Sequence, residues 1–345
     1  MRKSLKKLLT GVLSLIMVLS LSACGSSSES GKTDTTAKGV SGKLMIYTSI
    51  YPDIIEVVKP ALKKAFPDLE VEWFQGGTEK VVTKVTGEIE AKKIQADLVM
   101  VADPSYYLGL KEKNLLLKYL APNAKDVISG KDEEGYWTSV RISNMIIAYN
   151  TDKVKEADAP KTYKELTEAK WKGKIAMPNP LLSGSAYVTA GALVDKYGWD
   201  YFTNLKNNGL VVEEGNSAVQ NKLITGEYEA CIILEENILK LTAKGEPVKV
   251  VYPEDGVISI PSPIAIMKDG PNNEAAKAVE NWWLSKEGQE AIVKGWMHSV
   301  RSDVNPPTGA PALKTFIDKA MKTDWDKLNK NNEEIKEKFR STVME

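Results

Sequence analysis

The chain has little cysteine and almost no histidine. Its 345 residues include two cysteines, Cys24 and Cys231, and one histidine, His298. Two cysteines cannot build a disulfide framework or a thiolate metal site. A single histidine excludes most catalytic triads and histidine-rich metal centres. We therefore expect no cofactor and no bound metal.

Phosphate loops, nucleophile elbows and basic surfaces are also missing. The chain has no Gly-x-x-x-x-Gly-Lys-Ser/Thr sequence, and Gly184-Ser185 lacks the flanking residues of a nucleophile elbow. Lys and Arg number 46 against 46 Asp and Glu, so nothing in the charge balance attracts nucleic acid. These absences favour a binding protein over an enzyme. The enzymatic alternative, a lipoprotein acting on extracellular polymers, lacks a paired general acid and base.

The first residues have the pattern of an export signal. Basic residues precede an apolar run from Leu8 to Leu21, which is too short to span a membrane. Leu21-Ser22-Ala23-Cys24 resembles the bacterial lipobox, which implies removal of residues 1–23 and acylation of Cys24. We expect this anchor to hold the protein on the outer face of the cytoplasmic membrane. The alternative is an ordinary signal cut near Ala23 with an unmodified Cys24.

The globular part is expected to be α/β and to begin near residue 43. Residues 24–42 are rich in Gly, Ser, Thr and Lys and predict a flexible tether after the acylated cysteine. Apolar strands are predicted at 43–49, 96–101, 143–149, 210–213 and 230–234 and an alternating strand at 69–74, with amphipathic helices between many of them. This pattern predicts two lobes, 43–137 plus 258–345 and 138–257, joined by two crossover strands.

Seven fragments in order resemble the solute-binding proteins of ABC importers, in the branch that contains ferric-iron, phosphosugar and phosphonate receptors. They are Ile46–Ser49, Ala102–Tyr107, Ile147–Asn150, Pro180–Tyr187, Val250–Gly256, Leu284–Ala291 and Val300–Val304. The resemblance implies a type II periplasmic-binding fold that closes around a small molecule and docks on a membrane permease. We expect a monomer.

Candidate ligand residues follow the predicted strands at the edge where open α/β sheets bind ligands. In the first lobe they are Thr48, Ser49, Gly77, Thr78, Asp103 and Ser105; in the second they are Ser183, Gly184, Ser185, Tyr187 and Asn216. Helix starts rich in Ser and Gly suit an anion. Plain helix capping and turn formation explain the same residue types without a ligand.

Three charged residues complete the predicted site. Glu235 and Glu236 follow a strand and suit an ammonium group, sugar hydroxyls or a metal, although carboxylates also serve at helix starts without any ligand. Arg141 lies near the predicted hinge and suits a phosphate or carboxylate. A surface or inter-lobe salt bridge is its alternative role.

The expected cargo is a small organic anion, either a phosphorylated sugar or a phosphonate. Ferric members of the branch use adjacent tyrosines where this chain has Tyr187 alone. The pair Tyr106-Tyr107 and the single His298 are interpreted as packing residues. Uptake of ferric iron remains the alternative.

Overall fold

The computed structural model describes residues 39–345. The predicted signal peptide, Cys24 and all but the last residues of the predicted tether lie outside the described residues. The part that can be described belongs to one compact unit of the chain. Within residues 39–345, no helix combines the length and the apolar character needed to cross a membrane.

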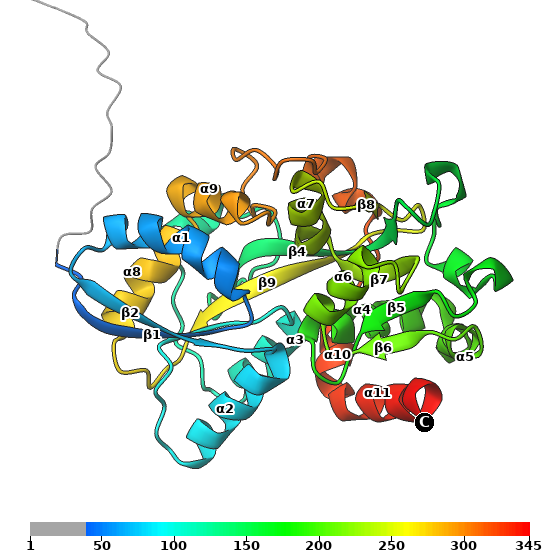
Figure 1. Ribbon diagram of the computed structural model, residues 1–345. Coiled ribbons are helices and arrows are strands. Elements are labelled where there is room, and N and C mark those ends of the chain that lie inside the picture. The colour runs from blue at the N-terminus through cyan, green and yellow to red at the C-terminus, as the bar shows by residue number, and fades with distance from the viewer. Residues whose placement is uncertain (1–38) are drawn as a thin grey trace, which may run out of the picture. The chain divides into compact units, whose positions relative to one another are not determined.

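A mixed nine-stranded sheet runs through the molecule in the order β2-β1-β3-β9-β4-β7-β5-β6, with β8 paired to β4. The strands are β1 (Gly42–Thr48), β2 (Leu69–Gln75), β3 (Leu98–Met100), β4 (Thr138–Asn150), β5 (Ile175–Pro178), β6 (Val211–Glu213), β7 (Ala230–Leu234), β8 (Val248–Val251) and β9 (Ile258–Ile266). Strands β1, β2 and β3 are parallel to one another, as are β5, β6 and β7. Each set forms the centre of one lobe (Figure 1).

Helices cover both halves of the sheet. They are α1 (Pro52–Ala65), α2 (Thr78–Glu90), α3 (Pro104–Glu112), α4 (Gly184–Tyr197), α5 (Trp199–Asn207), α6 (Asn216–Ile224), α7 (Glu235–Ala243), α8 (Asn273–Trp283), α9 (Lys286–Lys294), α10 (Trp325–Lys330) and α11 (Asn332–Phe339). In the first lobe, α1, α8 and α9 lie on one face and α2 on the other (Figure 1).

Alternation along the strands divides each lobe into two cores. On β1, Leu44 and Ile46 pack with α1 and α8, whereas Tyr47 packs with α2 and α3. On β7, Ile232 and Ile233 enter opposite cores in the same way. Successive strand residues point to opposite faces, so apolar runs without alternation mark strands that are covered on both sides. Both halves therefore have buried sheets, as the sequence predicted.

Strands β4 and β9 join the two lobes. They pair antiparallel over most of the distance from Thr138 to Met145, and β9 continues into the first lobe to pair with β3. Every residue of β4 is buried, as expected for a strand at the centre of the molecule. This pair corresponds to the two predicted crossover strands.

The C-terminal region differs from its predicted placement. Residues 258–345 were expected to complete the first lobe, but Leu328, Ile335 and Phe339 pack in the core of the second. Helices α8, α9, α10 and α11 lie in this region, with no α-helix between α9 and α10. The aromatic side chain of Phe339 packs edge-on against Phe202 at 5.1 Å between ring centroids. Burial of such side chains fixes the last helices to the second lobe.

Candidate functional site

A cavity of about 250 Å³ lies between the two lobes. The residue that follows β1, the end of β2 and the starts of α1 and α2 line it from the first lobe, and the starts of α4 and α6 line it from the second. Its wall consists of Ser49, Tyr51, Gln75, Gly76, Gly77, Thr78, Ala102, Arg141, Leu182, Ser183, Ser185, Glu214, Gly215, Asn216, Ser217, Ala218 and Leu234. The volume fits a small metabolite.

Four helices begin at the wall of this cavity. Helices α1, α2 and α6 follow Tyr51, Gly77 and Gly215, none of which provides a side-chain cap. In α4, the Ser183 hydroxyl accepts a weak hydrogen bond of 3.4 Å from the Ala186 amide. The first amides of a helix have no intrahelical partners and carry partial positive charge. Their convergence creates a site suited to an anion.

Arg141 brings a full positive charge to the same wall. It lies on β4, is 3% exposed, and donates from Nη1 to Glu236 Oε1 at 3.1 Å and to Met297 Sδ at 2.9 Å. Both hydrogen bonds found for this guanidinium among the described residues come from one of its three nitrogens, while the group has five N–H donors. Burial raises the pKa of Glu236, and the charge of Arg141 opposes this effect. The predicted salt bridge and the predicted cleft position thus occur together.

Hydroxyl and amide groups complete the wall. Ser49 Oγ is buried and has no hydrogen-bond partner among the described residues. Ser185 Oγ lies 3.1 Å from Ser183 Oγ and accepts from Asn216 Nδ2 at 3.4 Å. A buried hydroxyl without a partner is costly unless another molecule satisfies it. Ser49 is therefore placed where a ligand acceptor or donor would stabilise it.

The structure brings seven of the predicted residues together at the cavity. They are Ser49, Gly77, Thr78, Arg141, Ser183, Ser185 and Asn216. Of the remaining seven, Thr48 lies in the core and Gly184 lies between the lobes. The Thr48 hydroxyl donates to the Met100 carbonyl at 3.0 Å and accepts from the Ile50 amide at 3.0 Å. Thr48 thus holds the turn that presents Ser49.

Tyr187 points into the second lobe and not into the cavity. Its side chain is 1% exposed, and its hydroxyl donates to the Leu328 carbonyl at 2.7 Å. The predicted ligand role does not fit this placement, because α10 covers the ring. Tyr107 is also a core residue, as predicted: its hydroxyl lies within hydrogen-bond distance of the carbonyls of Val99 and Pro263.

Removal of the Tyr187 hydroxyl should affect stability and not binding. We expect Tyr187→Phe to lower the free energy of unfolding by about 1 kcal/mol, since one buried hydrogen bond is lost. Ligand affinity, measured by calorimetry, should stay within about twofold of the original value, because the change lies outside the cavity wall. A large loss of affinity with unchanged stability would contradict this placement.

Glu235 belongs to a hinge network behind the cavity. Its carboxylate accepts from Asn144 Nδ2 at 2.7 Å, lies 3.0 Å from His298 Nε2, and accepts from the Tyr252 hydroxyl. Asn144 Oδ1 in turn accepts from Ser259 Oγ on β9. The network joins both crossover strands to α7, so Glu235 and His298 have a structural role here. Glu236 is likewise engaged by Arg141 and is absent from the wall.

Asp103 and Ser105 lie at a different cavity. Asp103 caps α3, where its Oδ1 accepts from the Ser105 amide at 3.0 Å and from Ser105 Oγ at 2.6 Å. Both residues line a space of about 410 Å³ between α2 and α3 on one side and the last helices on the other. Capping, the alternative interpretation of these residues, matches this placement.

Asp103 gives a pH-dependent prediction. Burial raises its pKa to about 6, so folding disfavours its charge and stability falls as pH rises from about 4 through 6. Asp103→Asn keeps an oxygen that accepts from Ser105 and removes the charge. We expect it to raise the free energy of unfolding by about 2 kcal/mol at pH 7.5 and to have little effect near pH 4. Urea unfolding of both proteins at pH 7.5 and pH 4 measures the change in the free energy of unfolding. An equal change at both pH values would contradict the raised pKa of Asp103.

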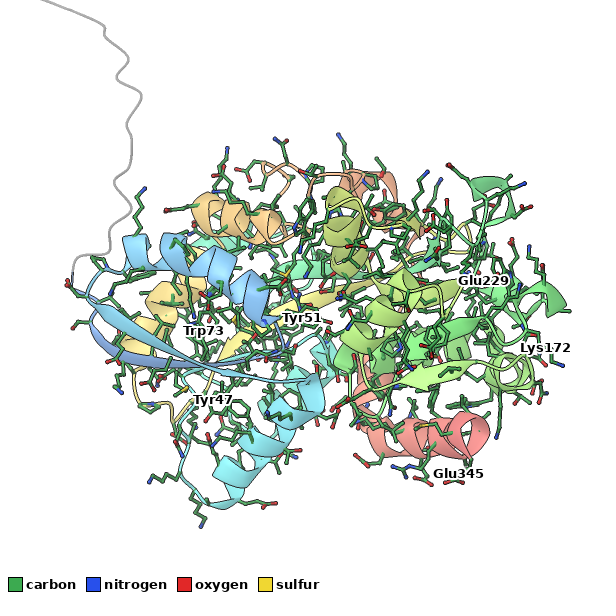
Figure 2. The ribbon with its side chains drawn as sticks, viewed as in Figure 1. Tyr47, Tyr51, Trp73, Lys172, Glu229 and Glu345 are labelled. Carbon is green, nitrogen blue, oxygen red and sulfur yellow. The ribbon has the colours of Figure 1, made fainter. Side chains whose placement is uncertain are left out.

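Tyr51 is the main wall residue that the sequence prediction missed. It precedes Pro52, the first residue of α1, and Figure 2 shows it at the junction of the two lobes. Burial raises the pKa of its hydroxyl, and the charge of Glu236 adds to this effect. Proline at the first helical position marks a helix start, so the residue before it could have been recognised as a wall candidate.

The family can now be assigned from comparison with known proteins. Residues 58–329 match the family described as bacterial extracellular solute-binding protein. The chain belongs to this family. Its members are transport proteins and not enzymes, so the chain is a solute-binding protein of an ABC transporter that delivers a small ligand to a permease.

Two curated relatives cover most of the receptor. An uncharacterized protein of Haemophilus influenzae is 24% identical over 291 residues, which is 80% of this chain and 82% of the relative. A protein of Salmonella typhimurium named "Putative 2-aminoethylphosphonate-binding periplasmic protein" is 26% identical over 257 residues, which is 69% of this chain and 72% of the relative.

Solved structures share the fold. The periplasmic binding protein AfuA from Actinobacillus pleuropneumoniae, with fructose-6-phosphate bound, has a TM-score of 0.78 and 22% identity over 88% of this receptor and 98% of its own chain. Iron-bound HitA from Pseudomonas aeruginosa has a TM-score of 0.75 and 21% identity, and the match covers 87% of this receptor and 99% of the HitA chain. The receptor therefore has the type II periplasmic-binding fold, as the sequence predicted.

Proposed function

We propose that this receptor captures a small organic anion with a phosphoryl or phosphonyl group in the cavity between its lobes. The observation that carries the proposal is the convergence of four helix starts and the Arg141 guanidinium on one wall. Amides at helix starts and a guanidinium are the groups that proteins use most readily for tetrahedral oxyanions. A phosphorylated sugar or a phosphonate satisfies this arrangement.

Each lobe has a distinct part in the proposed capture. The α4 and α6 starts, with Ser183, Ser185 and Asn216, face the acidic group from the second lobe. Ser49 and Thr78 close on it from the first lobe, and Tyr51 covers one side. The relatives support the same ligand class, because one is named for 2-aminoethylphosphonate and another holds fructose-6-phosphate.

Ferric iron is the alternative cargo, and the wall chemistry disfavours it. A hard trivalent cation needs several anionic oxygens, whereas this wall contributes only the Tyr51 hydroxyl and the Glu214 carboxylate as groups that can become anionic. The raised pKa of Tyr51 disfavours tyrosinate. The positive charge of Arg141 on the same wall repels a cation.

A thermal-shift screen tests the ligand class. The panel contains a phosphonate, a hexose phosphate, the matching neutral hexose and ferric citrate. At a concentration about 100-fold above the dissociation constant, a true ligand stabilises the protein by about 2.7 kcal/mol. We expect stabilisation by at least one phosphorus-containing compound and none by the neutral hexose. Stabilisation by ferric citrate alone, with a visible tyrosinate band, would overturn the proposal.

We also propose that Cys24 is acylated and tethers the receptor to the membrane. Cys24→Ser removes the thiol that would carry the lipid. We expect the variant to appear in the culture medium or soluble periplasmic fraction, because two or three acyl chains are what makes the anchoring stable. Fractionation followed by immunoblotting measures this, with Cys231→Ser as the control that stays with the membrane. Membrane retention of Cys24→Ser would contradict acylation.

A further inference from the structure

Two ion pairs link the lobes beside the cavity. Lys240 Nζ on α7 lies 2.5 Å from Asp53 Oδ2 on α1, and Lys336 Nζ on α11 lies 2.7 Å from Glu79 Oε1 on α2. Figure 1 shows α1 and α7 above the β9 crossover and α2 and α11 below it. Each carboxylate belongs to the first turn of a helix that begins at the cavity wall.

The two pairs have the same polarity. The acidic partners belong to helices whose apolar residues fill the first-lobe cores, and the lysines belong to helices whose apolar residues fill the second-lobe cores. Separation of the lobes would therefore break both pairs at once. A pair formed within one lobe could not respond to closure in this way.

Both lysine side chains are largely buried in the structure. The Lys240 and Lys336 side chains are only 19% and 12% exposed, and the Lys336 ammonium also lies 5.5 Å from the centre of the Tyr187 ring. Exposed ion pairs often contribute nothing because their long side chains lose entropy when the pair forms. Side chains that are already restricted lose little additional entropy. These pairs are therefore placed to contribute to closure.

Close contact between the lobes occurs beside the Glu79 pair. The Glu79 amide donates to the Leu182 carbonyl at 3.5 Å, and Gly184 lies against the Thr78 side chain and the Ala102 carbonyl. The Glu79 amide at the start of α2 thus has its hydrogen-bond acceptor on the opposite lobe. Its exchange with solvent reports lobe separation without any ligand.

We propose that Asp53–Lys240 and Glu79–Lys336 form an electrostatic latch that sets the fraction of receptor in the closed state. The affinity of a receptor that binds in one conformation scales with the population of that conformation. The latch tunes affinity for any cargo without touching it. The inference rests on the two-lobe arrangement and is independent of the proposed ligand class.

Hydrogen exchange of the ligand-free receptor tests the latch. We expect Lys336→Glu and Lys240→Glu each to speed exchange of the Glu79 amide by about threefold to fivefold at low salt, the range expected of partly exposed pairs. In 0.5 M NaCl the difference should shrink, because screening acts within a few ångströms. The swapped variant Glu79→Lys/Lys336→Glu should restore slow exchange.

A matched control separates the latch from general charge effects. Lys249 and Glu156 form a 3.0 Å pair in which both partners belong to the second lobe, so Lys249→Glu should leave exchange of the Glu79 amide unchanged. Unchanged exchange in both latch variants, or failure of the swap to restore it, would overturn the latch. Because no ligand is present, either result leaves the proposed ligand class untouched.

Discussion

The double variant Arg141→Met/Glu236→Gln is expected to lose anion binding by 100-fold or more while it remains folded. Arg141 is the one full positive charge among the described residues of the cavity wall, and removal of a charge partner from a buried site costs about 2 to 5 kcal/mol of binding. Methionine retains most of the apolar stem, and glutamine removes the carboxylate that arginine neutralises. Calorimetric titration with the best phosphorus-containing compound measures the loss.

The single variant Arg141→Met shows why both residues of the pair must change. Arg141→Met alone leaves the Glu236 carboxylate buried, at 4% exposure, without its guanidinium, which should lower the free energy of unfolding by about 3 kcal/mol. The double variant should recover most of this stability without recovering affinity. Retained anion affinity in the double variant would show that Arg141 serves only the salt bridge.

Gly184→Ala is expected to weaken ligand binding by about tenfold while the fold stays intact. A Cβ at this position would lie 2.8 Å from Thr78 Oγ1 and 3.1 Å from the Ala102 carbonyl, both on the opposite lobe. Closure would require these atoms to move apart, and about 1.4 kcal/mol of strain in the closed state corresponds to that tenfold loss. Calorimetry and thermal unfolding of the same samples separate affinity from stability.

Gly87→Ala is the matched control for this prediction. Gly87 is also helical, in α2, and no atom lies within 4 Å of a Cβ added there. We expect it to stabilise the protein by up to about 1 kcal/mol, as alanine does in helices, and to leave affinity unchanged. Equal affinity of Gly184→Ala and the original protein would show that the lobes need not meet at this point.

Strand patterns predicted the two α/β lobes, although not the lobe to which the last helices belong. The buried runs at 43–49 and 230–234 have local signatures that tertiary packing reinforces. The rule that ligands bind at the carboxyl ends of parallel strands also located the cavity edge correctly. These features depend on short-range periodicity, which one sequence contains in full.

Side-chain roles depended on contacts between distant segments. The inward direction of Tyr187 is fixed by Leu328, and the structural role of Glu235 is fixed by Asn144 and His298. Tyr51 reaches the cavity because α1 begins at the junction of the lobes. No local pattern determines which polar residue beside a strand end faces the cavity and which one completes the network behind it.

The most direct test of the proposed ligand class is native mass spectrometry of the receptor purified without denaturation, combined with ³¹P NMR of whatever is released on unfolding. An anion-binding cavity with Arg141 on its wall predicts a bound small molecule of a few hundred daltons or less that contains phosphorus. A bound ferric ion, or a released compound with no anionic group, would contradict the assignment.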